Sequence, residues 1–365
     1  MSARYAGHAT LSDTRMKNNF LFSQLPGLVA RTAFLAFATS TTSVFAQVSA
    51  IEAGWDMTVI DAPGNQGYSP IRDPLLPQVP AGTGRVDYSF RISRTELRTS
   101  QWVEFVNTFP LVAGSSRWIP GSWGALTDFS TPAGARRYYV PAEYPEAINY
   151  PVDAIDAVAS AAYCNWLCSG KSTNPAALRS GAYDLGEYFD TGVRPTRYTR
   201  SLNATYFIPS LNEITKAFYY DPNRYGINQG GYWQYNNSSD VPPIWGSPQS
   251  GGTANAGFFT GDPFIPVGAY PTVQTPWGLL DAAGGSSEWT DSQHPFYPDG
   301  VLYTKGSGQW DTSVAVDGID ISRQISGFAA LGTLRLASTI PAPSSVFTTI
   351  ILLSYCATLR KRKTR

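Results

Sequence analysis

The stretch that decides the fold runs from Pro276 to Asp291 and reads PWGLLDAAGGSSEWTD. It combines a pair of adjacent glycines and a run of small residues with three carboxylates and two tryptophans. Glycine adopts positive φ without steric cost, so main-chain carbonyls in such a segment can turn toward one point. Calcium is bound by carboxylate and carbonyl oxygens. The stretch is therefore more typical of a tight turn around an ion than of a helix or a regular strand.

For this turn we predict Asp281 and Glu288 as anionic calcium ligands, with the carbonyls of Gly284 and Ser286 completing the shell. The alternative is a glycine turn closed by a buried Trp289, with both carboxylates in solvent. The residues leave both interpretations open, because the spacing lacks the D-x-D-x-D-G pattern of an EF-hand loop.

The same stretch resembles the G-L-x-D-x-x-G-N-V-W-E-W signature of the formylglycine-generating enzyme family, also called sulfatase-modifying factor domains. The matching positions are Gly278, Leu279, Asp281, Gly284, Glu288 and Trp289. The chain departs from the signature, most notably at two positions. Gly285 stands where the family has asparagine, and Ser287 stands where it has the first tryptophan.

Further segments resemble motifs of this family in the family's order. They are ELRTSQWVEFVN at 96–107, PVDAIDAVASAAYCNWL at 151–167, PSLNEITKAFYY at 209–220, YTKGSGQW at 303–310 and GTLRLAS at 332–338. The resemblance runs from about Asp56 to Ser338 and implies a single domain with the loop-rich α+β fold of formylglycine-generating enzymes, which is related to C-type-lectin-like domains.

Residue patterns predict several elements inside this domain. Alternation predicts a strand over Val86–Ile92, and Thr99 is expected to cap a helix with an apolar face. A second helix, expected to start from a cap at Asp153, is apolar on two sides and is predicted to lie buried between layers. Ser210 and Glu213 form a capping box for a third helix.

Cysteine and histidine are scarce. Cys164 and Cys168 lie four apart on one predicted helix, where a disulfide would need distortion, so we interpret them as small core side chains. Cys356 lies in an apolar segment near the end of the chain. His8 and His294 are the only histidines, which excludes a multi-histidine metal site, and we interpret His294 as a surface or structural residue.

The two ends of the chain are typical of export signals. Residues 1–46 are predicted to be a signal peptide cleaved after Ala46, with Met1 or Met16 as the start. Residues 340–365 combine a proline-containing motif, an apolar helix and a basic tail, and resemble a PEP-CTERM sorting signal. An ordinary membrane anchor is the alternative. Residues 47–339 then form the folded domain, placed at the cell surface or in the extracellular matrix.

The resemblance also implies a first calcium site. At the positions matching the family's ligands stand Asn255, Ala256, Asp262 and Phe264, with Ala256 and Phe264 contributing carbonyl oxygens. The alternative here is a polar turn between short strands, because aspartate and asparagine are common turn residues.

The chemistry of the family is not carried by this sequence. Its enzymes oxidise a sulfatase cysteine to formylglycine with a cysteine pair that binds copper(I), located between the R-G-G-S-W and G-F-R motifs. Soft thiolates hold copper(I). The corresponding segment of this chain, 311–333, reads DTSVAVDGIDISRQISGFAALGT and contains no cysteine. We therefore do not expect a copper site.

The sequence favours a calcium-stabilised binding or scaffolding module. Aromatic residues make up 13% of the chain, and they could face a polysaccharide or another surface protein. A net charge of zero gives no electrostatic footprint for nucleic acid. The expected partners are an exosortase-type sorting protease and, before processing, the membrane. A formylglycine-generating oxidoreductase with relocated thiols is the alternative, and a hydrolase built on Glu288 with Asp281 or Asp291 ranks last.

Overall fold

The computed structural model of the protein describes residues 50–340, apart from 53, 71–78, 110–122, 129, 132–137, 259, 296–299, 328 and 330–331. The described residues all fall within one compact unit, Phe45–Arg365. The predicted signal peptide lies outside them, as does the predicted sorting signal beyond Ile340. In the part of the chain that is described, no helix has the length and apolar character needed to cross a membrane.

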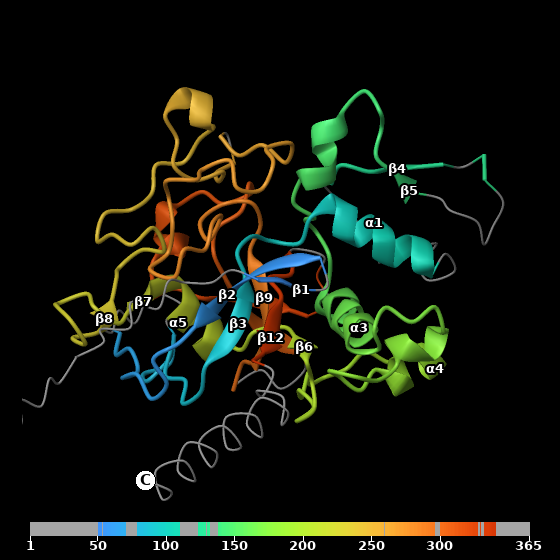
Figure 1. Ribbon diagram of the computed structural model, residues 1–365, viewed down its shortest axis with the longest axis horizontal. Helices are drawn as coiled ribbons and strands as arrows, with labels where there is room; N and C mark the ends of the chain where they lie inside the picture. Colours follow the sequence, from blue (N-terminus) through green and yellow to red (C-terminus); the bar gives the residue numbers. More distant parts are fainter. Residues whose placement is uncertain are drawn as a thin grey trace, which may run out of the picture. The chain divides into compact units, whose positions relative to one another are not determined.

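A five-stranded antiparallel sheet joins the beginning and the end of the domain (Figure 1). Its strand order is β1-β2-β3-β12-β6, with bounds Ala50–Glu52, Trp55–Ile60, Phe90–Ser93, Ala337–Thr339 and Tyr206–Phe207. Ile92 of β3 pairs with Thr58 on one side and with Ala337 on the other. Pairing of β12 with β3 fixes the end of the last family motif, which includes Ala337 and Ser338, against the segment that precedes the first motif.

A second sheet carries the central stretch of the sequence. Its order is β11-β10-β9, with bounds Arg323–Ser326, Val301–Lys305 and Glu288–Gln293. Two short hairpins complete the strands: β4 (Leu126–Thr127) with β5 (Tyr138–Tyr139), and β7 (Tyr220–Asp221) with β8 (Gly231–Tyr232). Long irregular segments connect these elements, which confirms the expected loop-rich α+β fold.

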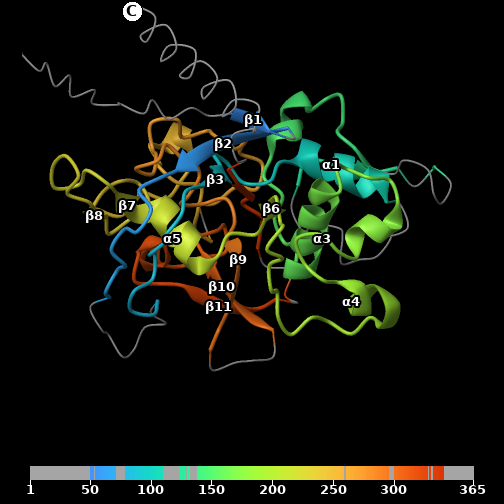
Figure 2. The same ribbon diagram turned by 60° about the horizontal axis from the view of Figure 1, so that its bottom comes forward.

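The described helices are short and flank the sheets (Figure 2). The α-helices are α1 (Thr99–Thr108), α3 (Ala157–Cys168), α4 (Gly186–Thr191) and α5 (Leu211–Tyr219). The 3₁₀-helices are η2 (Pro145–Asn149), η3 (Pro175–Leu178), η4 (Pro248–Ser250) and η5 (Val314–Asp317). Helix α3 packs beside β6, and α5 packs on β9 and β10. Each sheet therefore has a helix packed against it, α3 at the five-stranded sheet and α5 at the three-stranded sheet.

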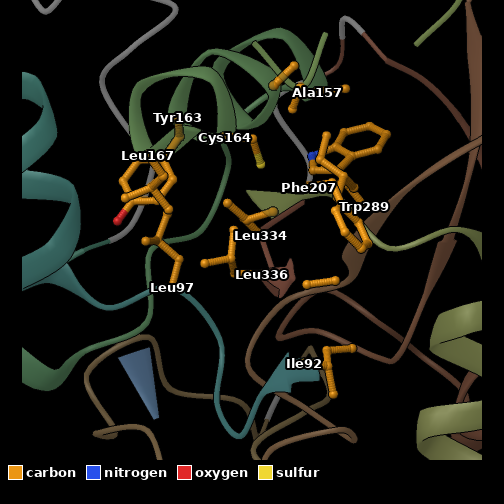
Figure 3. Close-up of a cluster of buried hydrophobic side chains, with 14 of the residues drawn as sticks. Ile92, Leu97, Ala157, Tyr163, Cys164, Leu167, Phe207, Trp289, Leu334 and Leu336 are labelled. Carbon is orange, nitrogen blue, oxygen red and sulfur yellow. The ribbon is translucent and has the colours of Figure 1, made fainter. Parts of the chain in front are cut away.

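Helix α3 is the buried helix that its two apolar sides predicted. Every residue from Ala157 to Leu167 is buried, and Cys164 points toward Leu334 in the core cluster (Figure 3). The predicted cap was wrong. The side chain of Asp156 caps the helix by accepting from the amide of Ala159 at 2.7 Å, because Ala154 with φ of 59° interrupts the helix after Asp153. Asp153 is thereby free for another role.

The starts of α5, α1 and β3 were also predicted, and two of them differ in the structure. The capping box of Ser210 and Glu213 is present at α5. The cap of α1 lies at Arg98 instead of Thr99, whose hydroxyl donates to the carbonyl of Tyr150. Strand β3 starts only at Phe90, because the backbone at Val86 is held by Asn65, the side chain of which accepts from the Val86 amide.

Candidate functional site

The central stretch folds as a tight turn that leads into a strand. Asp281, Gly284 and Gly285 all have positive φ, at 51°, 93° and 70°. The prediction of a turn is confirmed for these residues, but from Glu288 onward the chain forms β9. The amide of Gly285 donates to the carbonyl of Asn255 at 2.8 Å. This bond brings the two predicted calcium loops side by side.

Glu288 forms a buried ion pair with Arg335, a residue of the last family motif. Both side chains are completely buried, and the closest atoms, Arg335 Nη2 and Glu288 Oε1, are 3.0 Å apart. The other guanidinium donors bind the main-chain oxygens of Ser93, Arg94, Leu280 and Asp281. Arg335 therefore ties the turn to the end of β3, and Glu288 Oε2 is left buried without a hydrogen-bond partner.

Glu96 is a third carboxylate at this turn that the sequence reasoning did not place there. Its Oε1 accepts from the amide of Ser286 at 2.8 Å. Burial, followed by repulsion from Glu288, raises the pKa of Glu96 well above its ordinary value. A Cβ atom on Gly285 would lie 2.2 Å from Glu96 Oε2. The glycine that departs from the family signature thus makes room for this carboxylate.

The alternative in which both carboxylates of the turn face solvent was wrong. Glu288 is buried, and Asp281 is half-buried with its Oδ2 accepting from the amide of Gly268 at 2.6 Å. The buried Trp289 of that alternative is confirmed, and its indole donates to the carbonyl of Ile155. The last of the four predicted ligand residues, Ser286, is also buried, and its hydroxyl donates to Asp153.

The other predicted calcium residues form one compact loop. The Asn255 side chain donates to the carbonyl of Asp262 at 2.7 Å and accepts from its amide at 2.9 Å. Asp262 Oδ1 accepts from the amide of Phe264 at 2.8 Å, and the carbonyl of Ala256 accepts from Thr260. Asp262 and Phe264 are exposed, so the loop can be reached from solvent.

Both loops contain oxygen atoms suited to calcium. The orphaned Glu288 Oε2 and the exposed carboxylate of Asp262 are the best-placed anionic donors. In the described residues, no group of three or more His, Cys, Asp and Glu side chains is arranged to hold a metal ion. Any ion in either loop would thus depend on carbonyl oxygens as well as carboxylates.

A polar pocket of about 40 Å³ opens next to the segment that follows the YTKGSGQW motif. Asp153 forms one wall, where its Oδ2 accepts from Gln309 Nε2 at 3.1 Å. Asp311 forms another, where its Oδ2 accepts from Arg323 Nη2 at 2.5 Å and from the amide of Gly308. Arg323 Nη2 also donates to Ser287. The pocket therefore presents two carboxylates, an amide and a guanidinium at fixed positions.

Aromatic residues stand beside this pocket. Trp310, which lines it, is 66% exposed, and Phe258 is 52% exposed. Their ring centroids lie 5.9 Å apart. Large aromatic side chains exposed next to converging polar groups are typical of ligand sites. The sequence motif placed Trp310 near the family's reactive segment, but Asp153 and Phe258 come from distant parts of the chain and could not be assigned to this pocket.

Lys305 holds the segment behind the pocket in place. Its buried ammonium donates to the carbonyls of Gly318, Ile319 and Ile321, at distances of 2.5 to 3.2 Å. Burial lowers its pKa to about 7. The residue at the family's motif position therefore has a structural role in this chain.

The cysteines and the histidine lie away from the pocket. Cys164 and Cys168 are unbonded, as predicted. Burial raises the pKa of Cys164 well above its ordinary value, and Cys168 Sγ contacts the backbone of Tyr206 in β6 at 3.4 Å. His294 is buried with its ring against Tyr303, which supports the structural and not the surface interpretation. Cys356 and His8 lie outside the described residues.

Comparison with known proteins identifies the family. Residues 46–319 match the model of the sulfatase-modifying factor enzyme 1-like domain. No curated protein sequence matches the chain. The span of the match covers the turn, both predicted calcium loops and the first part of the polar pocket.

Three solved structures are similar to this chain at low sequence identity. CarF is 17% identical, with a TM-score of 0.45 over 79% of this chain and 99% of its own. PvdO from Pseudomonas aeruginosa is 14% identical, with a TM-score of 0.42 over 78% and 94%. Treponema denticola variable protein 1 is 16% identical, with a TM-score of 0.45 over 78% and 95%.

Proposed function

Because the chain belongs to the family of sulfatase-modifying factor enzyme 1-like domains, we propose that it uses this fold to bind carbohydrate at the polar pocket beside Trp310. The observation that supports this most is the exposed pair of Trp310 and Phe258 next to fixed carboxylate, amide and guanidinium groups. A sugar has the matching chemistry, since its ring has an apolar C–H face and a rim of hydroxyl groups.

The pocket size indicates how much of the sugar enters. A volume of about 40 Å³ is far below the ~300–1,000 Å³ of pockets that enclose a whole ligand. One hydroxyl or hydroxymethyl group fits, and the ring itself then lies outside against Trp310. Asp153 and Asp311 accept hydrogen bonds from hydroxyl groups, and Arg323 donates to a sugar oxygen. Because the Arg323 charge is already paired with Asp311, we expect a neutral sugar.

The oxidoreductase alternative is less favoured. It needs accessible thiols near the substrate, yet Cys164 lies in the core beside Leu334 and the segment 311–333 contains no cysteine. A buried thiol with a raised pKa is a poor nucleophile and a poor copper ligand at neutral pH. The hydrolase alternative is weakened as well, because Glu288 is paired with Arg335.

We also propose that calcium stabilises the two adjacent loops. Asp262 and the Asn255 loop would hold one ion, and Glu288 with the carbonyls of Gly284 and Ser286 would hold the other. The bond between Gly285 and Asn255 couples the loops, so an ion in either one rigidifies both. Ser286 belongs to one of these loops and also lines the polar pocket, so an ion in that loop would influence ligand binding through the shape of the pocket.

Export to the cell surface or matrix remains part of this proposal. It is supported by the sequence of both ends of the chain and by the abundance of polysaccharide in that location. A sorting protease would act on the segment after residue 340 before the domain meets its ligand.

The proposal is tested by affinity electrophoresis in gels that contain a neutral polysaccharide, with soluble cellulose, starch, mannan and chitin derivatives compared. We expect retardation by at least one of them, and Trp310→Ala should weaken it about tenfold or more, since a tryptophan at the centre of an interface is a typical hot spot. Tyr225→Ala is the matched control, because Tyr225 has the same exposed fraction of 66% outside the pocket.

Two results would overturn carbohydrate binding at this site. One is the absence of retardation by every neutral polysaccharide, and the other is equal weakening by Trp310→Ala and Tyr225→Ala. Oxidation of a sulfatase-derived cysteine peptide, lost on Cys164→Ser, would instead establish the oxidoreductase.

A further inference from the structure

A second cavity, of about 460 Å³, lies between β4, η2 and the loop that contains Phe264. Four aromatic residues line it: Trp123, Tyr144, Tyr150 and Phe264. Its one charged lining residue among those described is Glu146. None of these residues takes part in the polar pocket beside Trp310, so the cavity needs an explanation of its own.

The walls of the cavity are held by hydrogen bonds within the chain. The amide of Gly124 donates to the Thr99 hydroxyl at 2.9 Å, and that hydroxyl donates to the carbonyl of Tyr150 at 3.1 Å. On the other side, the amide of Val267 donates to the carbonyl of Asn149 at 3.0 Å. These bonds join α1, β4, η2 and the Phe264 loop, so the cavity is a formed site and not a gap between loose segments.

Close packing fixes the same arrangement. A Cβ atom at Gly124 would lie 2.0 Å from the carbonyl oxygen of Ala147, so the chain just before β4 approaches η2 as closely as only glycine allows. The rings of Tyr150 and Phe264 meet with centroids 5.7 Å apart at an angle of 57°. This contact holds both rings in the wall of the cavity.

The electrostatics of the cavity favour a cation. Aromatic faces carry negative potential and attract cations within about 6 Å of the ring centroid. Glu146 adds a full negative charge, and its Oε1 lies 3.5 Å from the Tyr150 hydroxyl. The exposed carboxylate of Asp262, two residues before Phe264, lies near enough to Tyr150 to act on its hydroxyl. No lysine or arginine is among the described lining residues.

The kind of cation follows from the scarcity of hydrogen-bond acceptors, since Glu146 is the one carboxylate among the described lining residues. A primary ammonium or a guanidinium has several N–H donors, and apolar walls with a single carboxylate would leave most of them unsatisfied. A quaternary ammonium has no N–H donor and an apolar methyl surface, so it meets no such penalty. Aromatic cages with an acidic residue are suited to this group.

We infer that this cavity binds a small molecule of the choline class, with its trimethylammonium group among Trp123, Tyr144, Tyr150 and Phe264 and its charge balanced by Glu146. The volume suits a single small molecule, since ligand pockets typically span ~300–1,000 Å³. Space beyond the ammonium group accommodates the rest of the ligand. The inference does not rest on carbohydrate binding at the other pocket.

Isothermal titration of the full chain with choline and with 3,3-dimethyl-1-butanol tests this inference. The alcohol has the shape of choline without its charge. We expect choline to bind about fivefold more tightly or better, in line with a cation–π gain of ~1 kcal/mol. Glu146→Gln should reduce the affinity for choline and leave that for the alcohol unchanged. Glu143→Gln, an exposed glutamate outside the cavity, is the matched control.

A second variant separates the aromatic contribution from the carboxylate. Tyr144 is 61% exposed, so Tyr144→Leu should leave the fold intact and weaken choline binding. The inference is overturned if choline shows no binding at millimolar concentration or if the alcohol binds as tightly as choline. It is likewise overturned if Glu146→Gln has no more effect than Glu143→Gln.

Discussion

At the scale of single residues, Arg200 shows how this core distributes charge. It donates to both oxygens of Glu213, at 2.9 and 2.8 Å, and through Nε to Asp291 Oδ2 at 3.2 Å. One guanidinium thus serves two carboxylates that are almost fully buried. Burial alone would raise the pKa of Glu213, but pairing with Arg200 overrides it and lowers the value. At Asp291 the effect of burial is larger than that of Arg200, and it raises the pKa of this carboxyl to about 7.

This difference predicts a pH dependence of stability. The pKa of Asp291 is about 7 in the folded state against 3.8 when unperturbed, so between these values the folded chain holds a proton that the unfolded chain has released. The proton on Asp291 therefore contributes to the free energy of unfolding. This contribution is fully present below pH 3.8 and is lost as pH rises to 7, by up to ~1.4 kcal/mol per pH unit. Asp291→Asn cannot titrate and should lack this slope.

Urea unfolding at one-unit intervals from pH 4 to 8 measures the effect. The free energy of unfolding of the wild type minus that of Asp291→Asn should fall from pH 4 to 7 and then stay constant. Asp87→Asn, on the surface, controls for the removal of one carboxylate. A difference between wild type and Asp291→Asn that does not change with pH would contradict the assignment.

At the scale of elements, the turn of residues 281–287 depends on a glycine that the family signature does not contain. Gly285 combines a φ of 70° with a position where a Cβ atom would meet the Glu96 carboxylate at 2.2 Å. Gly192, at the end of α4, has a φ of 74° with no atom within 4 Å. Alanine at Gly192 would cause backbone strain alone, whereas alanine at Gly285 would cause backbone strain and a steric collision.

Gly192→Ala should cost about 1–2 kcal/mol, the strain of a left-handed alanine. Gly285→Ala should cost about 1–3 kcal/mol more, because the added methyl group must displace a buried carboxylate. Chemical denaturation of both variants measures the two costs. If both variants are destabilised equally, Glu96 can move aside at no cost in stability. Its carboxylate then does not stabilise the turn.

At the scale of the whole molecule, the proposed calcium ions predict a stability that depends on metal. Calcium at a hundred times its Kd should stabilise the folded state by about 2.7 kcal/mol, which raises the Tm by several degrees. Asp262→Asn should reduce this rise, because it removes the anionic ligand of the exposed loop. Thermal unfolding of the full chain with calcium, magnesium or a chelator measures it.

Asp240→Asn serves as the control for this experiment, since Asp240 is an exposed carboxylate that is paired with Arg224 and is not one of the proposed ligands. A rise of equal size in Asp262→Asn, or no rise in the wild type, would exclude calcium from that loop. A response to copper(I) that is lost on Cys164→Ser would favour the oxidoreductase alternative instead.

The amino-acid sequence by itself determined the family, the single domain, the turn at its centre and the capping box of α5. It also showed that the segment 311–333 lacks the family's cysteines. These features depend on local spacing, on glycine positions and on residue identity, and all of them are visible along the chain. The buried character of α3 followed in the same way, from apolar residues on two sides of a helix.

Only the tertiary structure placed Asp153, Phe258 and Glu96. Asp153 was expected to cap a helix and instead faces Gln309, because their contact joins residues 156 positions apart. Glu96 meets Ser286 across 190 positions. The aromatic cavity likewise combines three distant segments. Such contacts depend on how long loops close, and the strand and helix periodicities of a sequence carry no information about that.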